Sequence, residues 1–427
     1  MTLLGTLATI LLILAVPIGT VLAGAALIFI FFDPMLAPGT VFNSFFNFIT
    51  KYTLMAVPLF IFAGFLMEKT GLIGKLFRFA DAVIGWVPGG FGFATLLAAV
   101  LFGAISGSST AMAAAMGVIA YPEMRKRGYP AWLAAGMIAS GGGIAILIPP
   151  SIILILFGIL TETSIVELFF AGVVPGIMLA ISDAVVLLIA AWWLKLPAGK
   201  FDARILLQAT LEAWPALLMP VVILGGLYGG LFTPTEAGAA ACGYALIYGF
   251  LARPRQFLRD LMPVTVRSLN LTSVIFFLLG CVGVFQFVLA NQGWAQHLTQ
   301  WAIGLNLPTM GFMVILLLAL LFLSMFLSGI AIVVLTVPVF FPITVSMGVD
   351  PVLLGIVTAL AMEMGVIIPP VGLNLFAVAG TTRVPLYDVI RGSSPFLFTD
   401  GIVLVLVMWM PILALWLPGQ LVKSVFN

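Results

Sequence analysis

The sequence predicts an all-α polytopic membrane protein made of two inverted repeats, each with a re-entrant helical hairpin and a broken helix. Three observations predict this fold class. Apolar residues make up 63% of the 427 residues and charged residues only 7%, whereas a soluble domain carries roughly a quarter charged residues. Tandem prolines interrupt two apolar segments, at 141–151 and 363–374. The segments around these interruptions share their proline spacing, which indicates a duplication.

Apolar runs of membrane-spanning length follow one another along the chain, and no polar region is long enough to fold as a separate soluble domain. The N-terminus lacks the basic region and the small-residue cleavage site of a signal peptide, so we expect a retained span there. Two further segments, 91–125 and 309–346, are long enough to enter the membrane and return as hairpins. The predicted spans are 4–31, 52–68, 131–160 (broken), 165–194, 214–231, 235–251, 265–290, 351–380 (broken) and 395–418.

Each tandem proline removes two backbone amide donors and fixes φ, so no α-helix continues through it undisturbed. Backbone freed in this way is tolerated inside a membrane only where it is buried in protein or lines a cavity. Paired interruptions at equivalent places in two halves are typical of a secondary transporter's binding site. The sequence therefore predicts that 141–151 and 363–374 line such a site.

The duplication is visible when residues 108–175 are superimposed on 328–395 without a gap. Chance sharing between these two apolar windows predicts fewer than one coincident proline, and four coincide. We therefore interpret the two windows as copies of one unit. The coincident prolines are Pro122 with Pro342, Pro149 and Pro150 with Pro369 and Pro370, and Pro175 with Pro395.

Basic residues predict the orientation of the two halves. Cytoplasmic loops of membrane proteins carry an excess of Lys and Arg. With both hairpins re-entrant, only Lys51 and Lys423 fall on the outer side. The first hairpin then opens from the cytoplasm and the second from the outside, and the N-terminus is cytoplasmic. The residues on the cytoplasmic side are Lys69, Lys75, Arg78, Arg125, Lys126, Arg127, Lys195, Lys200, Arg204, Arg253, Arg255, Arg259, Arg267, Arg383 and Arg391.

The centre of the first hairpin, FGAISGSSTAMAAAMG (102–117), concentrates small residues and hydroxyl groups. Small residues let the backbone approach an ion closely, and the hydroxyl groups supply oxygen ligands. Helix N-termini at such a tip would also present backbone amides to an anion. The alternative interpretation is ordinary small-residue packing between membrane helices. The hydroxyl-bearing residues are Ser106, Ser108, Ser109 and Thr110.

The second hairpin, FLSGIAIVVLTVPVFFP (326–342), has Ser328 and Gly329 at its tip, opposite the second broken helix. That broken helix contains Glu363, and an ionisable residue is costly in hydrocarbon, which makes it a candidate for a functional site. Glu363 is predicted to ligate a cation, to carry a coupled proton, or to accept hydrogen bonds from free backbone amides. The same segment offers Gly365, Gly372 and Asn374.

Other charged residues have simpler interpretations. Residues 72–87 are predicted to form an amphipathic interfacial helix that carries Lys75, Arg78 and Asp81, with a counterpart at 293–306. The run 125–127 is a cytoplasmic topology signal. Arg383, just after the second broken helix, would either meet a substrate carboxylate or extend to the membrane surface.

The motifs SGSSTAMAAAMG, GGGIAILIPPS, TVPVFFP, GVDP and PPVGLNLF, in this order, resemble the large membrane subunit of tripartite ATP-independent periplasmic (TRAP) transporters. The resemblance covers essentially the whole chain. It implies an elevator fold in the bacterial inner membrane and sodium-coupled import of a small organic acid. It also implies two partners, a small four-helix membrane subunit and a soluble periplasmic substrate-binding protein, and no cofactor besides sodium ions.

The resemblance assigns two sodium sites and a substrate site to the hairpins and broken helices. At the second site the family commonly has an acidic residue where this chain has Ser328, and a threonine where it has Ile368, so fewer oxygen ligands are expected there. The expected residues are Ser106, Gly107, Ser108, Ser109, Gly142 and Pro149 at the first sodium site; Ser328, Gly329, Glu363, Gly365, Pro369, Gly372 and Asn374 at the second; and Ser108, Thr110, Ser151, Asn374 and Arg383 for substrate.

The expected organisation has a scaffold helix and loop (1–50), a first transport repeat (51–163), scaffold helices (164–263), a second transport repeat (264–382) and a C-terminal scaffold helix (383–427). A proton-coupled or otherwise ion-coupled carrier of the same fold, or a channel, is the alternative. ATP hydrolysis is not expected because no phosphate-binding G-x-x-x-x-G-K-[ST] motif occurs, and His297 as the only histidine argues against an intramembrane metalloenzyme.

Overall fold

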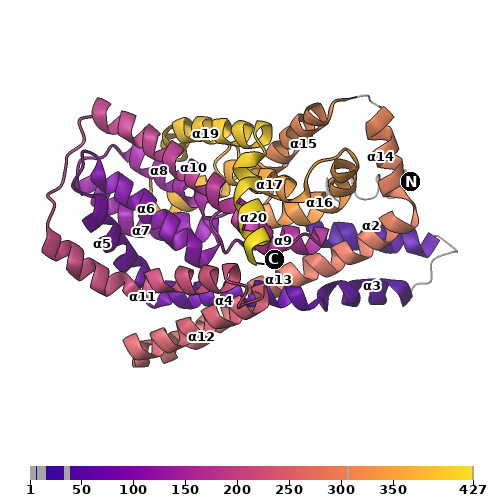
Figure 1. Cartoon of the computed structure of the whole chain (residues 1–427), viewed down its shortest axis with the longest axis horizontal. Coiled ribbons are helices and arrows are strands. Elements are labelled where there is room, and N and C mark those ends of the chain that lie inside the picture. Colours follow the sequence, from indigo (N-terminus) through magenta and orange to yellow (C-terminus); the bar gives the residue numbers. More distant parts are fainter. Residues whose placement is uncertain (1–5, 7–15, 33–38, 305–306, 426–427) are drawn as a thin grey trace.

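The computed structural model describes the chain except for residues 1–5, 7–15, 33–38, 305–306 and 426–427, and the described parts are dominated by helices (Figure 1). Six of the described helices are long and apolar enough to cross a membrane. This confirms the predicted class. The helices outside the two hairpins and the two broken helices are α2 (Ile18–Phe32), α3 (Gly39–Ile49), the 3-10 helix η1 (Tyr52–Met55), α4 (Ala56–Lys69), α5 (Leu72–Ile84), α10 (Ile165–Trp193), α11 (Ala203–Tyr228), α12 (Pro234–Ala252), α13 (Pro254–Asn291), α14 (Trp294–Gly304), α19 (Leu386–Trp409) and α20 (Ile412–Val425).

Both predicted hairpins are present. The first consists of α6 (Gly90–Ser106) and α7 (Ser109–Lys126), and the second of α15 (Thr309–Ser324) and α16 (Gly329–Ser346). Gly107 ends α6 with a φ of 57°, a left-handed conformation that glycine adopts readily, and the chain reverses there. In the second hairpin the Ser328 hydroxyl caps α16 by accepting a hydrogen bond from the amide of Ala331 at 3.4 Å.

Both predicted broken helices are present as well. The first is divided into α8 (Ala131–Ile144) and α9 (Ile152–Thr161), and the second into α17 (Pro351–Gly365) and α18 (Leu373–Thr382). The tandem prolines fall in the gap between the half-helices in each case, as their missing amide donors require. Both Pro–Pro peptide bonds are cis.

Each hairpin packs against both broken helices. In the first hairpin α7 contacts α8 of its own repeat and α18 of the other, while in the second α15 contacts α17 and α16 contacts α9. Helices α10 and α19 pack on each other, and both contact α8 and α17. We call the hairpins, the broken helices, α10 and α19 together the transport core. The remaining helices surround it, with α2, α3, α4 and α12 packed along α13 (Figure 1).

Helix α5 forms within the segment 72–87, where an amphipathic helix was predicted, and α14 forms at the position of its counterpart. The buried residues of α5 recur at helical spacing and make one apolar face, which packs on α6 and α11. The buried residues are Leu72, Ile73, Leu76, Phe77 and Ala80.

Three predicted spans had inaccurate bounds, and one helix was not predicted. The span at 395–418 is two helices, because the residue before Pro411 is excluded from the α conformation and α19 ends at Trp409. Helices α11 and α13 begin well before 214 and 265, since their first turns are amphipathic rather than apolar and an apolar window misses them. Helix α3 was not predicted as a helix. Most of the first part of span 4–31 lies outside the described residues.

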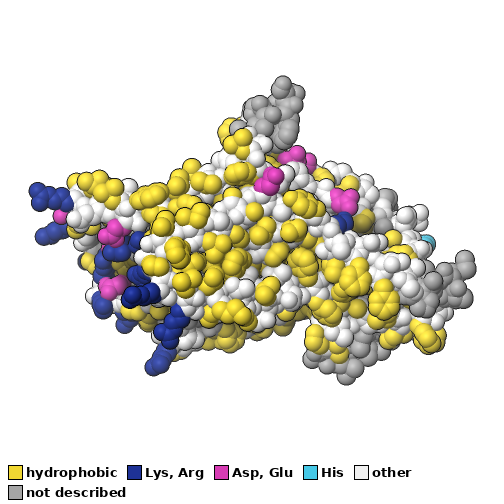
Figure 2. Space-filling view, turned by 90° about the horizontal axis from the view of Figure 1, so that it is seen from below, with side chains coloured by type: hydrophobic (Ala, Val, Ile, Leu, Met, Phe, Trp, Pro, Cys, Tyr) yellow, Lys and Arg dark blue, Asp and Glu magenta, His cyan; other side chains and the backbone are white. Residues whose placement is uncertain are grey.

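The charges gather as the predicted orientation requires. Lys and Arg side chains cluster at one end of the long axis in Figure 2. On the predicted outer side, Lys51 pairs with Glu162 at 2.9 Å, in the loop between α9 and α10. On the predicted cytoplasmic side Arg267 pairs with Glu68 at 3.2 Å. In each pair, both residues lie on the same side of the membrane in the predicted inverted topology.

Candidate functional site

Asn374 joins the two repeats at the centre of the transport core. Its side chain lies at the N-terminal end of α18 and is completely buried. The amide Nδ2 donates to Ser109 Oγ at 2.8 Å and to the carbonyl of Ala139 at 2.9 Å, and Ser109 Oγ lies 3.1 Å from Asn374 Oδ1. Both amide hydrogens therefore have acceptors in the first repeat, as burial of a carboxamide demands.

The tip of the first hairpin lies directly on the first helix break. A Cβ atom at Gly107 would come within 2.8 Å of the Pro150 carbonyl, and one at Gly142 would come within 2.6 Å of Asn374 Nδ2 and 3.1 Å of the Ser109 carbonyl. Glycine at position 107 thus lets the hairpin tip approach the helix break, and glycine at position 142 lets α8 approach α7. The structure brings Gly107, Ser109 and Gly142 together at the first helix break, beside Pro150.

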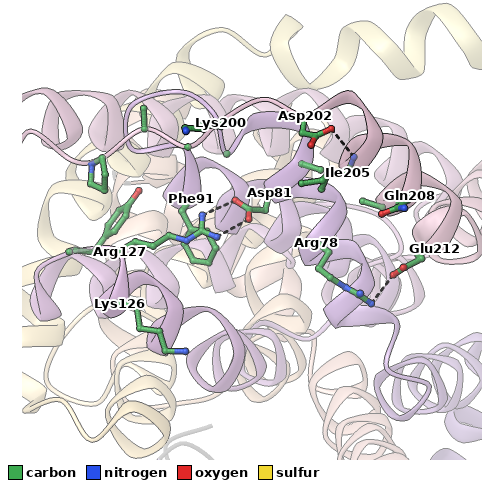
Figure 3. A pocket seen from close by; sticks show the side chains of 18 residues that line it. Arg78, Asp81, Phe91, Lys126, Arg127, Lys200, Asp202, Ile205, Gln208 and Glu212 are labelled. Atoms are coloured by element: carbon green, nitrogen blue, oxygen red, sulfur yellow. Dashed lines mark hydrogen bonds and ion pairs between the residues drawn. The ribbon is translucent and has the colours of Figure 1, made fainter.

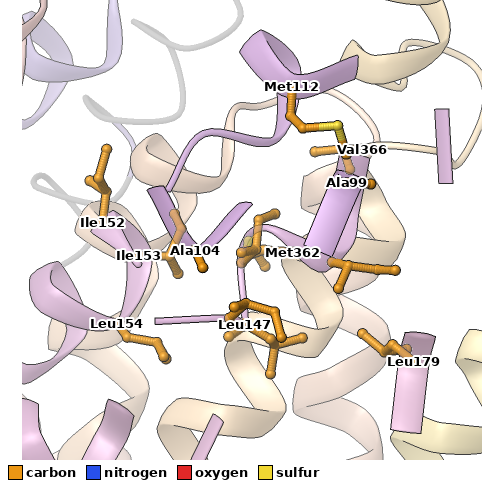
Figure 4. Close-up of a cluster of buried hydrophobic side chains, with 14 of the residues drawn as sticks. Ala99, Ala104, Met112, Leu147, Ile152, Ile153, Leu154, Leu179, Met362 and Val366 are labelled. Atoms are coloured by element: carbon orange, nitrogen blue, oxygen red, sulfur yellow. The ribbon is translucent and has the colours of Figure 1, made fainter. Parts of the chain in front are cut away.

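The surroundings of this break are apolar and densely packed. Every residue of 141–151 is buried, and Figure 4 shows Ala104, Met112, Leu147 and Ile153 among the side chains there. The buried Ser151 hydroxyl caps α9 by accepting from the amide of Leu154 at 3.4 Å.

The other residues predicted for the first sodium site and for the substrate do not all lie near the first break. Ser108 has extended backbone and begins α7, and Thr110 is half-buried in its first turn. Ser106 ends α6, and its side chain is outside the described atoms. Arg383 is exposed at the far end of α18, about 13 Å along the helix from Asn374. The structure therefore separates Arg383 from the other candidates.

The second break is built differently from the first. Ile368 to Val371 are partly or fully exposed, unlike the wholly buried 141–151. Ser328 is exposed, and a Cβ at Gly329 would contact Ile153 and Met362. The hydroxyl that approaches this break is that of Ser324, which a Cβ at Gly365 would strike. The sequence interpretation missed Ser324, the last residue of α15, because it considered only Ser328 and Gly329, where α16 begins.

Glu363 does not face the second hairpin. Its carboxylate lies against α8, where a Cβ at Gly143 would strike Glu363 Oε1 and approach Cγ to 2.7 Å. Gly365, which faces Ser324, is two residues further along α17 and therefore on nearly the opposite side of the helix. The sequence grouped Glu363 with Ser328 and Gly329, and the structure brings it instead to the first repeat.

Two further buried carboxyl groups accompany Glu363. Asp183 on α10 and Asp400 on α19 are 0% and 1% exposed, and Glu363 is 0% exposed. Ser140 Oγ on α8 lies 3.3 Å from Asp183 Oδ2 and 3.4 Å from Asp400 Oδ2. We call Asp183, Asp400, Glu363 and Ser140 the acid cluster.

Sequence reasoning missed Asp183 and Asp400. The available signal was that each is an isolated carboxylate far inside an apolar span, a placement that is rare without a function.

An open pocket of about 780 Å³ lies elsewhere, where α5 and α11 meet the base of the first hairpin (Figure 3). Arg127 forms two hydrogen bonds to Asp81, at 3.1 and 3.0 Å, and lies 3.8 Å from the ring centroid of Phe91. Arg78 pairs with Glu212 at 2.8 Å. Four basic and three acidic side chains line the pocket, and the ion pairs connect the hairpin to α5 and α5 to α11.

Tyr129 supports the hairpin base beside this pocket. Its hydroxyl accepts a hydrogen bond from the amide of Gly92 at 2.9 Å. Burial raises the pKa of Tyr129 to about 12, so the phenol stays neutral at physiological pH. None of the residues predicted for ions or substrate lines this pocket, so we interpret it as the junction between the transport core and its surrounding helices.

Two inverted repeats whose hairpins and broken helices meet at a buried polar centre define the architecture of a secondary membrane carrier. Solved transporters share this fold. The structure is similar to the YdaH transporter of Alcanivorax borkumensis (TM-score 0.59, 15% identity, 88% of this chain and 87% of that chain). It is also similar to MtrF of Neisseria gonorrhoeae (TM-score 0.61, 13% identity, 88% and 83%).

The chain belongs to the family described as "Tripartite ATP-independent periplasmic transporter, DctM component", which it matches over residues 5–413. It is 39% identical over 374 residues to the C4-dicarboxylate TRAP transporter large permease protein DctM of Pseudomonas aeruginosa, covering 87% of this chain and 88% of that protein. It is 32% identical over 375 residues to the sialic acid TRAP transporter large permease protein SiaM of Vibrio cholerae, covering 87% of each.

Proposed function

We propose that this chain is the membrane permease of a secondary transporter that imports a small organic acid delivered by a soluble periplasmic binding protein. Family membership supports the class of protein. The names of the two relatives, C4-dicarboxylate and sialic acid permeases, support a carboxylate substrate. The single observation that carries the proposal is the buried polar contact of Asn374 with Ser109 and Ala139, where hairpin and broken-helix elements of both repeats meet.

Sodium is the proposed coupling ion at this meeting point. Serine hydroxyl groups and backbone carbonyls are hard oxygen ligands, which suit a hard cation. The close approach of Gly107 to the Pro150 carbonyl, and of Gly142 to the Ser109 carbonyl, brings backbone oxygen to the tip without an intervening side chain. The second site would use Ser324 and the exposed break around Pro369, with fewer oxygen ligands than the first.

We further propose an elevator movement of the transport core against the surrounding helices. The division suggested by the sequence put 164–263 and 383–427 in the scaffold. Because α10 and α19 pack directly on α8 and α17, we assign these two helices to the moving part. Helices α2, α3, α11 and α12 stay in the scaffold. Helices α4 and α13, which the sequence division put almost wholly in the transport repeats, join the scaffold because they pack on each other and on α12. The ion pair of Arg127 with Asp81 in Figure 3 lies across the proposed boundary, between the base of the first hairpin and α5.

A small membrane subunit and the inner membrane complete the proposal. Helices α11 and α13 carry exposed apolar side chains along much of their length, including Leu207, Leu211, Trp214, Val266 and Phe277. In a bilayer these faces meet lipid or a second membrane subunit. We assign the hydroxyl groups of Ser108, Thr110 and Ser151 and the amide of Asn374 to substrate binding, and give Arg383 a place only at the cytoplasmic exit.

The test is uptake into liposomes that contain this chain, its small subunit and the binding protein, with succinate as the C4-dicarboxylate probe and sialic acid in parallel. Uptake should saturate, require the binding protein and stop when the sodium gradient is collapsed. Rates that do not saturate and are indifferent to sodium and to the binding protein would indicate a channel and overturn the proposal.

A further inference from the structure

The acid cluster lies where four helices of the transport core converge. Helix α8 contacts α10, α17 and α19, and α10, α17 and α19 also contact one another. Ser140 and Gly143 are three residues apart on α8 and so share a face, which puts the Asp183–Ser140–Asp400 contacts next to Glu363.

No basic side chain in the described part of the chain forms an ion pair with these three carboxyl groups. All five ion pairs among the described residues lie elsewhere and involve none of the three carboxyl groups. A buried carboxylate without a positive partner is strongly disfavoured and takes up a proton instead. Three negative charges in one buried site would in addition repel one another.

The number of hydrogen-bond donors around the three carboxyl groups also favours their protonated form. Ser140 has one hydroxyl hydrogen but contacts an oxygen of each aspartate, so it can donate fully to one of them only. The other contact is favourable when that aspartate is protonated and donates to Ser140. Asp183 Oδ1 and both carboxyl oxygens of Glu363 are buried without a partner among the described residues. Such unpartnered oxygens are unusual in a native structure, and they cost more free energy when the carboxyl group is charged than when it is protonated.

We propose that Asp183, Asp400 and Glu363 form a proton-binding site in the transport core, in which at least two of the three carboxyl groups are protonated. A proton fits where a metal ion does not: no group of acidic, histidine or cysteine side chains in the described part of the chain is arranged to hold a metal. The site is separate from the hairpin tips, and its protons travel with the core as a second coupling ion. This coupling role rests on the proposed function, whereas proton occupancy does not.

Other charged groups lie at the ends of the elements packed against the cluster. Among the residues whose side chains are described, none of them forms an ion pair with a cluster member. These residues are Glu123, Arg125 and Lys126 on α7, Glu167 on α10, Asp350 before α17, Arg383 after α18, and Asp388 and Arg391 on α19.

Infrared spectroscopy of the full chain in lipid tests proton occupancy, because a protonated carboxyl group absorbs at a frequency separate from that of a carboxylate. At neutral pH the wild type should show this band, and Glu363→Gln and Asp400→Asn should each reduce it. Glu162→Gln is the control, since Glu162 is exposed and paired with Lys51, and it should leave the band unchanged. Absence of the band in the wild type, or a band untouched by Glu363→Gln, Asp400→Asn and Asp183→Asn, would overturn the proposal.

Uptake in the complete reconstituted system tests the coupling role. Wild-type uptake at a fixed sodium gradient should vary severalfold between about pH 6 and pH 8.5, and Glu363→Gln and Asp400→Asn should flatten this profile while uptake still requires sodium. A wild-type profile that is already flat overturns the coupling role. If sodium dependence is absent but the infrared band is present, the proposed sodium coupling fails and the proton site stands. If a variant does not fold, the infrared band of the wild type still tests proton occupancy, and the pH profile of wild-type uptake still tests the coupling role.

Discussion

Glu363 on α17 and Gly143 on α8 occupy equivalent positions of the two repeats and lie in direct contact. The duplication register that pairs the two proline breaks also pairs these two residues. One repeat contributes a carboxyl group, and the other leaves out a side chain to make room for it. The two copies of the broken helix have therefore diverged in a complementary way at the point where they meet.

This contact predicts that Gly143→Ala destabilises the protein. The new Cβ would strike Glu363 Oε1 and approach Cγ to 2.7 Å in a fully buried place, and overpacking of this kind costs about 1–3 kcal/mol. Gly141→Ala is the matched control, because its Cβ would make only ordinary contacts at 3.4 Å or more. Thermal unfolding of the two variants in detergent measures the difference; equal midpoints would contradict the contact.

Removing the carboxyl group should rescue the substitution. Glu363→Ala opens the space that the methyl group added by Gly143→Ala needs, so the double variant should be more stable than the sum of the two single effects predicts. A coupling free energy near zero in this double-mutant cycle would show that the two side chains do not compete for one space.

Asn374→Ala should cost about 2–3 kcal/mol of stability, because it deletes two donated hydrogen bonds between the repeats and leaves a cavity in a buried place. Asn291→Ala is the control, since that exposed amide donates one hydrogen bond, to Phe287, and should change stability by less than about 0.5 kcal/mol. Because the contact joins hairpin and broken helix, Asn374→Ala should also raise the sodium concentration for half-maximal uptake. Unchanged stability and sodium dependence would remove Asn374 from the centre.

Gly107→Ala separates backbone strain from a steric contact. Residues 107 and 128 both have positive φ, 57° and 85°, so alanine costs about 1 kcal/mol at either position. A Cβ at Gly107 would also come within 2.8 Å of the Pro150 carbonyl, whereas nothing lies within 4 Å at Gly128. Gly107→Ala should therefore reduce both stability and uptake more than Gly128→Ala does, as measured by unfolding and by transport. Equal effects of the two substitutions would mean that residue 107 is not in close contact with the Pro150 carbonyl.

The sequence predicted the elements of the core well and their contacts poorly. A proline pair and a terminating glycine affect only the backbone beside them. The two helix breaks were therefore predicted at the right places, and the hairpin at 91–125 was predicted to within a residue at each end. The pairing of Asp183 with Asp400 depends on packing between helices more than 200 residues apart, and neither residue carries a local sign of its partner. Glu363 was identified as a candidate functional residue, but the sequence could not show which neighbouring helix its side chain faces. Either Glu363 or Gly365 can face the second hairpin, depending on how α17 is rotated about its own axis. That rotation is determined by the packing of α17 against the helices around it.

The ion pair of Arg127 with Asp81 is expected to contribute little to stability. The two side chains are 39% and 27% exposed, and partly exposed pairs are worth about 0.5–1 kcal/mol even when bidentate. Arg127→Lys should lose most of this, because lysine cannot form two parallel hydrogen bonds or stack on Phe91 in the same way. Lys126→Ala is the control at an exposed neighbouring pair. If the pocket is the boundary of a moving core, Arg127→Lys should alter the uptake rate more than stability, and an unchanged rate would argue against that boundary.

Ser108→Ala tests the first ion site without disturbing the fold. Ser108 is half-buried at the start of α7, where a lost hydroxyl contributes little to packing, so the unfolding midpoint should change by no more than a few degrees. If the hydroxyl helps to bind sodium, the concentration for half-maximal uptake should rise several-fold while the maximal rate changes less. Ser394→Ala, which removes an exposed hydroxyl bound to the Ile390 carbonyl on α19, should leave both quantities unchanged. Normal uptake with wild-type sodium dependence in Ser108→Ala would exclude this residue from the site and direct attention to Ser109, whose hydroxyl is already engaged by Asn374.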